Sequence, residues 1–347
     1  MATPMETDKR SHALRELDRA EICRIPKVEL HCHLDGIIDP TMLRDLQARG
    51  VTIPITAEAL QRAYPVEDFE SFSSWFDVQN GLAGGLDEYR PILAAHVERL
   101  RAQNVVYTEI MFASSEIWRC ERSEVLERFR GFREFADGLE GGDVQIEFVA
   151  GWNRRRPHDG QVDEIARRIL MLHEAGLIAG VFLAGPEEGN PVERYASTFA
   201  QFRDARLPIE IHAGEWCGPE SVWDALEHGR PQRIGHGVTI FDDHRLLEHV
   251  RAERIHVEMC PTSNVKTAAV RRIEDHPIGR ARALGLTFSI NTDDPGAFEC
   301  TLTGELEVVA RTFGFTTADF HRIGRDALAA RFKPTLRHPN TRALAGG

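Results

Sequence analysis

The chain has 347 residues, which is enough for one large α/β barrel or for two ordinary domains. Hydrophobic residues make up 42% of it and charged residues 28%, a composition that excludes a disordered chain and provides for a sizeable core. The formal net charge of -12 argues against binding to nucleic acid or to an anionic membrane, because both require a basic protein surface.

The scattered cysteines, together with the lack of a secretory signal or membrane-spanning apolar run in the sequence, predict a cytoplasmic protein. The six cysteines are scattered without a C-x-x-C pair, so free thiols in a reducing compartment are expected. Residues 1–21 are polar and do not resemble a secretory signal, and no apolar run reaches the length of a membrane span. We interpret residues 1–347 as a single domain and expect residues 1–10 to be disordered.

Short apolar, β-branched runs recur along the chain, and each precedes a longer segment of helical periodicity. The strand candidates are Val28–His33, Val105–Phe112, Val144–Trp152, Ile178–Ala184, Pro208–His212, Arg233–His236, Ile255–Cys260 and Leu286–Asn291. This alternation predicts an α/β fold, specifically a (β/α)8 TIM barrel. A doubly wound open sheet is the alternative, but no G-x-G-x-x-G follows the first strand to support it.

The connection between the first two strand candidates is several times longer than a usual crossover. Helices are expected within it at Thr56–Arg62, Phe69–Asn80 and Asp87–Arg101, and a further helix is expected later at Glu220–His228. A segment that follows a barrel strand lies at the face where barrel active sites form. We therefore predict a helical insertion over the active site, with Phe72 and Phe76 contacting substrate. Ordinary packing of these rings is the alternative.

His31 and His33 end the first predicted strand in the pattern H-x-H. In a chain with 15 histidines, a pair with this spacing occurs by chance almost as often, so the pattern alone is weak evidence for a metal site. Alternate residues of a strand face one side, so both imidazoles point into the barrel. His212 and Asp293 take the equivalent position at the ends of the fifth and eighth strands. Three imidazoles and one carboxylate favour zinc or a similar divalent ion, with room for a water.

A second metal held by a carboxylated lysine is excluded by the distribution of lysines. Lysine occurs only at Lys9, Lys27, Lys266 and Lys333, and the fourth predicted strand, which ends in FLAGPE, has none. The sequence therefore predicts a mononuclear site.

Two further polar residues follow the ends of predicted strands. Glu215 lies three residues after His212, where a protonated carboxyl can deliver a proton to a substrate nitrogen, and His236 ends the sixth strand. The alternatives are a helix N-terminal carboxylate for Glu215 and a hydrogen-bonded core histidine for His236. Arg154–Arg156 either bind phosphate or form a solvated, salt-bridged loop.

Seven segments in order resemble the adenosine deaminase family of the amidohydrolase superfamily. They are PKVELHCHLDG, VVYTEIMF, FLAGPE, IHAGE, RIGHG, EMCPTSN and SINTDDP, and they run from about residue 26 to about residue 297. The resemblance implies one Zn²⁺ per chain, held by His31, His33, His212 and Asp293.

The resemblance also implies the roles of the remaining site residues. Glu215 would protonate N1 of the purine, and His236 would orient and deprotonate the water that attacks C6. Asp294 would accept a hydrogen bond near N7, the Gly185 N–H would meet N3, and Asp35 would contact ribose hydroxyls. The predicted reaction is hydrolytic deamination of adenosine and 2'-deoxyadenosine, as in purine salvage, with a small purine nucleoside as the binding partner.

Two segments depart from the family pattern near the region that recognises the rest of the substrate. FLAGPE lacks an acidic residue before LAG, and IMFASS is less basic than its counterpart. Adenine, aminodeoxyfutalosine and N6-substituted adenine therefore stay open as substrates, while Glu in place of Asp35 would be typical of adenine deaminases. The acidic chain disfavours AMP, although the arginine run Arg154–Arg156 keeps AMP open as a substrate. A hydrolase of a cyclic amide or ester, and a non-catalytic binding barrel, are further alternatives, but the set of ligand and acid residues is complete.

Overall fold

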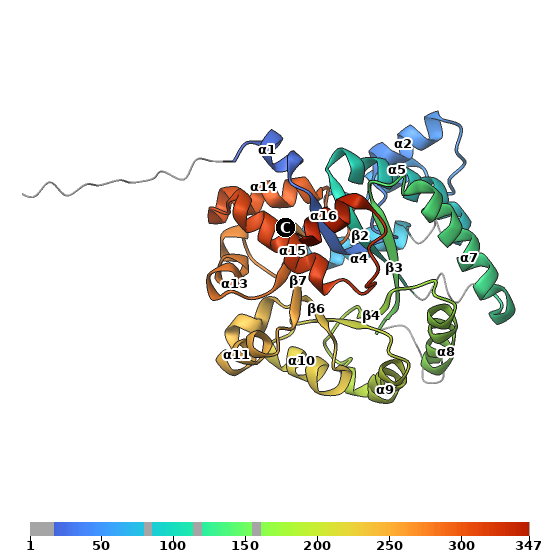
Figure 1. Ribbon diagram of the computed structural model, residues 1–347. Coiled ribbons are helices and arrows are strands. Elements are labelled where there is room, and N and C mark those ends of the chain that lie inside the picture. The colour runs from blue at the N-terminus through green and yellow to red at the C-terminus, as the bar shows by residue number, and fades with distance from the viewer. Residues whose placement is uncertain (1–16, 80–84, 114–119, 155–160, 347) are drawn as a thin grey trace, which may run out of the picture.

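A computed structural model of the chain describes residues 17–79, 85–113, 120–154 and 161–346 (Figure 1). Eight parallel strands form one sheet in chain order: β1 (Lys27–His33), β2 (Val105–Phe112), β3 (Gln145–Asn153), β4 (Gly180–Ala184), β5 (Ile209–Ala213), β6 (Arg233–His236), β7 (His256–Met259) and β8 (Phe288–Ile290). The predicted disorder of residues 1–10 lies outside the described residues.

The sheet closes on itself just beyond the end of β8. Cys32 pairs with Asp293 in a parallel bridge, and the His33 N–H donates to the Asp293 carbonyl at 2.8 Å. This closure, with helices between the strands, confirms the predicted (β/α)8 barrel.

Helices surround the barrel (Figure 1). They are α1 (Arg19–Arg24), α2 (Pro40–Ala48), α3 (Ala57–Gln61), α4 (Phe69–Gln79), α5 (Leu86–Ala102), α7 (Arg122–Leu139), α8 (Gln161–Glu174), α9 (Ala196–Asp204), α10 (Pro219–Asp224), α11 (His244–Ala252), α12 (Pro261–Lys266), α13 (Ile278–Leu284), α14 (Leu302–Phe313), α15 (Thr317–Ala330) and α16 (Pro339–Gly346), with the short turns η2 (Val192–Tyr195), η3 (Ala225–Gly229), η4 (Val238–Asp242) and η5 (Ile273–Asp275). In the described residues, no helix has the length and apolar character needed to cross a membrane.

The long β1–β2 connection contains α2 to α5, so a helical insertion is present as predicted. Helix α2 was not expected from the sequence, although its start carries a clear signal. The Asp39 carboxylate accepts the Met42 N–H at 2.8 Å, and Pro40 occupies the first helical position. The helix predicted over Glu220–His228 divides into α10 and the π-helical turn η3.

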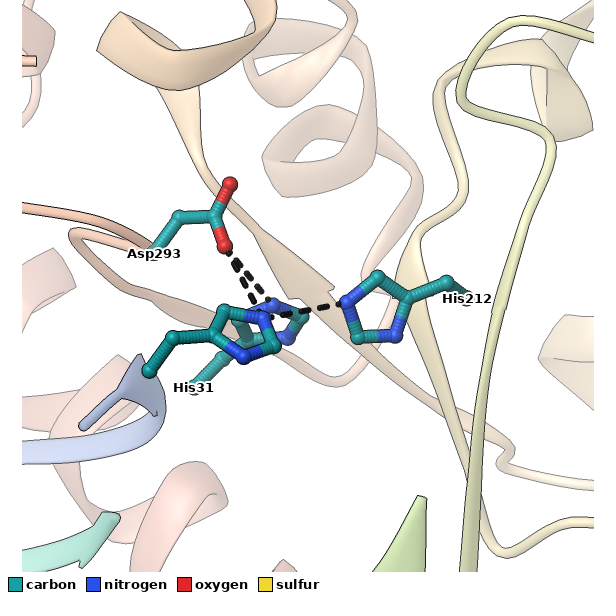
Figure 2. A group of neighbouring side chains, drawn as sticks. His31, His212 and Asp293 are labelled. Atoms are coloured by element: carbon teal, nitrogen blue, oxygen red, sulfur yellow. Dashed lines mark hydrogen bonds and ion pairs between the residues drawn. The ribbon is translucent and has the colours of Figure 1, made fainter. Parts of the chain in front are cut away.

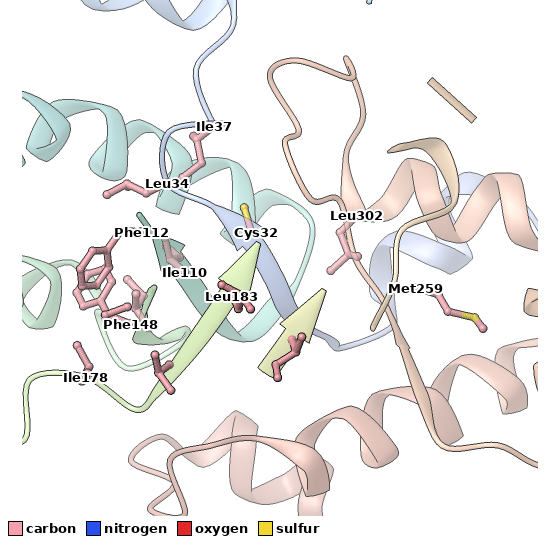
Figure 3. Close-up of a cluster of buried hydrophobic side chains, with 14 of the residues drawn as sticks. Cys32, Leu34, Ile37, Ile110, Phe112, Phe148, Ile178, Leu183, Met259 and Leu302 are labelled. Carbon is pink, nitrogen blue, oxygen red and sulfur yellow. The ribbon is translucent and has the colours of Figure 1, made fainter. Parts of the chain in front are cut away.

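Alternating residues of the strands fill two different cores. Outside the barrel, Ile110 and Phe112 of β2 pack with Phe148 of β3 in a large cluster shared with the helices, which Figure 3 shows in part. Inside the barrel, Met111 forms a smaller cluster with neighbours that include Phe332. The barrel interior is therefore packed, and a site can open only at an end.

Candidate metal centre and active site

Four side chains converge at the carboxyl end of the barrel: His31, His33, His212 and Asp293. Figure 2 labels three of them, His31, His212 and Asp293. His31 Nε2 lies 3.2 Å from Asp293 Oδ1. His33 Nε2 lies 3.3 Å from the same oxygen and 3.3 Å from His212 Nε2. All four are buried or nearly so, and the structure thus brings together the whole predicted ligand set.

The donor set fits a single metal ion. In a tetrahedral zinc site with bonds of about 2.0–2.1 Å, neighbouring ligand atoms lie about 3.3 Å apart, and the distances above agree with this spacing. Two imidazole nitrogens that face each other also repel unless a proton or a cation lies between them. The arrangement of three nitrogens and one oxygen is the kind that binds Zn²⁺ or a similar divalent ion.

Carboxylates behind the imidazoles set which ring nitrogen faces the site. His31 Nδ1 lies 2.9 Å from Glu258, and His212 Nδ1 lies 3.0 Å from Glu210. Each Nδ1–H donates to its carboxylate, which leaves Nε2 free to bind a metal. Glu258 in turn pairs with the fully buried Arg233 at 2.5 Å, and the same guanidinium pairs with Glu109 at 2.6 Å.

Two site residues adopt a backbone conformation that residues other than glycine rarely adopt. His236 has a φ of 62° and Asp293 a φ of 65°, both in the left-handed region. Such conformations persist only where the surroundings impose them, and they occur often at functional sites. Ser263 helps to fix Asp293, because its hydroxyl donates to Oδ2 at 2.7 Å.

Glu215 and His236 lie together beside the ligand set. Their side chains are 3% and 1% exposed, and Glu215 Oε2 is 3.5 Å from His236 Nε2. Burial, reinforced by the charge of Asp293, raises the pKa of Glu215 well above its usual value, which favours the protonated form of the carboxyl. Burial lowers the pKa of His236 to about 3, so its ring is neutral.

A chain of hydrogen bonds sets the tautomer of His236. The Ile278 N–H donates to His276 Nδ1 at 3.2 Å, so His276 carries its proton on Nε2 and donates it to Asn264 Oδ1. The Asn264 amide then donates to His236 Nδ1 at 3.0 Å. A neutral imidazole has only one N–H, so His236 presents a donor at Nε2 to the site.

Glu187 is a functional candidate that the sequence did not reveal. Its carboxylate accepts the N–H groups of Gly214, Glu215 and Trp216 at 2.7 to 2.9 Å, and the Ser221 hydroxyl as well. It therefore holds the backbone that carries Glu215. Glu187 is the last residue of the FLAGPE segment. Its hydrogen bonds to the backbone that follows β5 could not be predicted, because contacts between distant segments leave no pattern in the sequence.

The site opens into a cavity of about 590 Å³ whose wall includes most of the predicted substrate-binding residues. Phe72, Phe76, Gly185 and Asp294 line it directly. Asp35 is not among the lining residues, but its charge acts on Asp294. Burial and the neighbouring charges of Asp293 and Asp35 raise the pKa of Asp294 well above its usual value.

Neither expectation for the arginine run holds for Arg154. Its side chain is 2% exposed and donates to the main-chain oxygens of Asn190 and His212. The buried Arg154 side chain thus stabilises the backbone at the end of β5, and it neither binds phosphate nor forms part of a solvated loop. Residues 155 and 156 lie outside the described residues.

Comparison with known proteins identifies the family. The adenosine deaminase family model matches residues 26–343. The chain belongs to the adenosine deaminase family. It is 34% identical over 316 residues to an adenine deaminase of Rhizobium johnstonii, covering 89% of this chain and 95% of that relative. The resemblance read from the sequence motifs is confirmed, and the protein is a hydrolytic deaminase of adenine- or adenosine-like purines.

Solved structures support the fold. The crystal structure of adenine deaminase from Arthrobacter aurescens superposes with a TM-score of 0.79 at 24% identity, over 92% of this chain and 97% of that one. The N6-methyl-AMP deaminase from Arabidopsis thaliana gives 0.75 at 23% identity, over 95% and 97%. At these identities the likeness bears on the barrel and not on the substrate.

Proposed function

We propose that the protein deaminates adenine, converting adenine and water to hypoxanthine and ammonia with one Zn²⁺ per chain. The observation that carries the proposal is the complete metal-binding and acid–base set at the base of one cavity. The choice of base follows the curated relatives, which are 30–34% identical and are named adenine deaminases. These relatives favour adenine over adenosine, the substrate predicted first from the sequence.

The ligand residues His31, His33, His212 and Asp293 would hold the zinc, which when bound activates water as a nucleophile near neutral pH. The protonated Glu215 carboxyl donates to purine N1, which makes C6 more electrophilic. The carboxylate that remains is the nearest group able to take up the proton from the attacking water and pass it to the departing ammonia. The second water proton leaves the C6 hydroxyl as the 6-oxo group forms and returns to Glu215. The water oxygen thus stays on C6, N1 and the departing ammonia each gain one proton, and the acid is restored.

His236 has a different role here from the one the resemblance implied. Its N–H at Nε2 donates toward the site, so it orients the attacking water and stabilises negative charge on the oxygen. Burial raises the pKa of Asp294, and in its protonated form this carboxyl is able to donate to a ring nitrogen as well as to accept from one.

A nucleoside is the second candidate substrate, and two observations favour it. The cavity of about 590 Å³ lies within the range of pockets that hold drug-sized ligands, so it has room for a substituent on the purine. Asp35 also stands where the family's adenine deaminases tend to carry Glu, and it lies close enough to influence Asp294. Adenosine or an N6-substituted adenine would use this additional space.

A panel of substrates separates these candidates. Adenine, adenosine, 2'-deoxyadenosine, AMP, N6-methyladenine and aminodeoxyfutalosine are each followed by the ultraviolet change that accompanies conversion of the 6-amino to the 6-oxo purine. We expect kcat/KM to be highest for adenine by at least about tenfold, a difference of ~1.4 kcal/mol in transition-state binding. A preference of that size for adenosine would overturn the choice of adenine, and six flat traces would overturn the deaminase itself.

A further inference from the structure

A second large cavity lies at the opposite end of the barrel from the active site. It has a volume of about 870 Å³ and is formed where α9, η3 and α11 turn into β5, β6 and β7. The chain that follows α15 closes one side, and Phe332 forms part of the wall. Because the active site occupies the carboxyl ends of the same strands, the two cavities are separated by the packed barrel interior.

Five arginines surround this cavity, although the chain as a whole is acidic: Arg203, Arg206, Arg230, Arg254 and Arg331. Glu253 is the one acidic residue among the described lining residues. The wall therefore carries a strong local excess of positive charge, which attracts anions.

The positive charge of these arginines is largely uncompensated. The side chains of Arg206 and Arg230 make no hydrogen bond or ion pair with other residues that the structure describes. Arg203 donates to the main-chain oxygen of Gly229 at 2.8 Å, and Arg331 donates to that of Leu328 at 2.5 Å. Hydrogen bonds to neutral carbonyl groups orient a guanidinium without cancelling its charge.

Arg254 is the exception, because it faces a carboxylate. Its charge acts on Asp326, which also pairs with Arg322 at 3.5 Å. Even with Glu253 and Asp326 both counted against the five arginines, the cavity wall stays positive.

A buried histidine supplies an independent sign of a ligand. His256 lines the cavity and is only 3% exposed, yet neither ring nitrogen has a hydrogen-bond partner among the described residues. A buried polar group without a hydrogen-bond partner is unfavourable, and a bound molecule that supplies the partner removes that cost. Arg331 Nε is likewise buried and unpartnered within the described part of the chain.

Three of the arginines occupy equivalent backbone positions. Arg206, Arg230 and Arg254 each follow the end of a helical segment with a φ of 52° to 57°, in the left-handed region where glycine or asparagine is preferred. The same turn in three consecutive β/α units places all three at one end of the barrel. Arginine at these positions is thus not explained by backbone preference.

We propose that this cavity binds a phosphorylated small molecule of nucleotide size, with its phosphates on the arginines and its apolar part against Pro208, Ile255 and Phe332. Guanidinium groups bind phosphate oxygens through paired hydrogen bonds, and five of them suit more than one phosphate. The volume of about 870 Å³ accommodates a base and a sugar as well.

The test uses UTP, which has no 6-aminopurine and so is not a deamination substrate, with uridine as the uncharged comparison. Isothermal titration calorimetry on the full chain is expected to show one UTP site per chain and no uridine binding. The triple variant Arg206→Asn, Arg230→Asn, Arg254→Asn is expected to bind UTP at least about tenfold more weakly. Its Tm should stay equal or rise, because asparagine tolerates the left-handed region.

Two controls separate the cavity from general charge and from the active site. Arg44, Arg128 and Arg245 are exposed and lie outside the cavity lining, so replacing all three with Gln removes the same charge and should leave UTP affinity unchanged. Glu215→Gln should also leave it unchanged, since Glu215 belongs to the other end. Absence of UTP binding, equal binding of uridine, or equal loss in the control triple variant would each overturn the proposal. If the triple variant does not fold, Arg230→Asn alone gives the same comparison.

Discussion

Glu215 gains its proposed role from burial, and its backbone is held in place by residues that do not touch the cavity. A carboxyl that is 3% exposed and lies near the charge of Asp293 keeps its proton at a pH where an exposed glutamate has lost it. Glu215→Gln keeps the size and the hydrogen bonding of the side chain but removes the acid. We expect turnover to fall by roughly 10²–10⁴-fold while bound metal, measured by elemental analysis, is retained. Native turnover in this variant would show that another group protonates the purine.

Glu187 gives a second prediction at this scale, as a positioning residue. Glu187→Gln replaces one carboxylate oxygen with an amide NH2, which cannot accept the N–H groups of Gly214 or of Glu215 and Trp216. We expect kcat to fall about tenfold or more with a smaller change in KM, because the acid is misplaced while the cavity walls remain.

The adjacent Glu188 is exposed and serves as the matched control, since Glu188→Gln should leave both parameters unchanged. Loss of stability in Glu187→Gln with normal kcat would mean that Glu187 is only a structural brace.

The cluster that we propose to bind the metal could be predicted from the sequence because residue type and strand position coincide. Side chains along a strand face alternate sides, and the carboxyl ends of all strands meet at one end of the barrel. The three histidines His31, His33 and His212 lie at such strand ends. Glu187 and Asn264 could not be predicted, because both act through hydrogen bonds between elements far apart in the chain. Arg154 was misjudged for a similar reason, since burial under β5 depends on the packing of neighbouring loops.

At the scale of elements, α4 is the part of the insertion that reaches the active site. Phe72 stacks on Phe298 with ring centroids 5.1 Å apart, and Phe69 meets Trp216 edge-on at 5.0 Å. These contacts join the helix to the loops after β5 and β8. Trp75, by contrast, is fully buried and does not line the cavity among the described residues, so the aromatic rings of α4 divide between the cavity wall and packing.

We expect Phe76→Ala to raise KM about tenfold with little change in kcat, because the ring forms part of the cavity wall and carries no acid–base or metal-binding group. Steady-state kinetics with the best substrate of the panel measure this. Val78→Ala on the same helix, which is not part of the described cavity lining, should leave KM unchanged. Equal effects of both changes, or a lowered Tm with normal KM, would favour ordinary packing as the role of the α4 rings.

The outline of the elements was easier to predict than their ends. The eight strands lie within a few residues of their predicted bounds because the short apolar runs that form them in a barrel are buried on both faces. Helix α2 was missed because its apolar periodicity is short, although Asp39 and Pro40 mark its start. The helix predicted over residues 220–228 divides into α10 and the π-helical turn η3, where the backbone hydrogen bonds change their spacing. The spacing of apolar residues in the sequence does not report this change.

For the whole molecule, the four proposed ligand residues join β1, β5 and the segment after β8, which come from distant parts of the chain. A metal that binds only the folded state stabilises it by about 4 kcal/mol when its free concentration is a thousand times its Kd. Dialysis against a chelator should therefore abolish deamination and also lower the Tm of the whole barrel. Zn²⁺ should restore both, whereas Mg²⁺ should not, because nitrogen ligands disfavour it.

The control for chelation is His33→Ala, which removes one ligand whose side chain faces Asp293 and His212. Its Tm should already be low and should respond little to chelator, since the remaining three ligands bind zinc weakly. Retained activity and an unchanged Tm in the chelated wild-type protein would contradict a resident metal, and the short distances between His33, His212 and Asp293 would then have to be explained by a shared proton. A fall in Tm that the His33→Ala variant shows equally on chelation would instead locate the responsive ion elsewhere in the barrel.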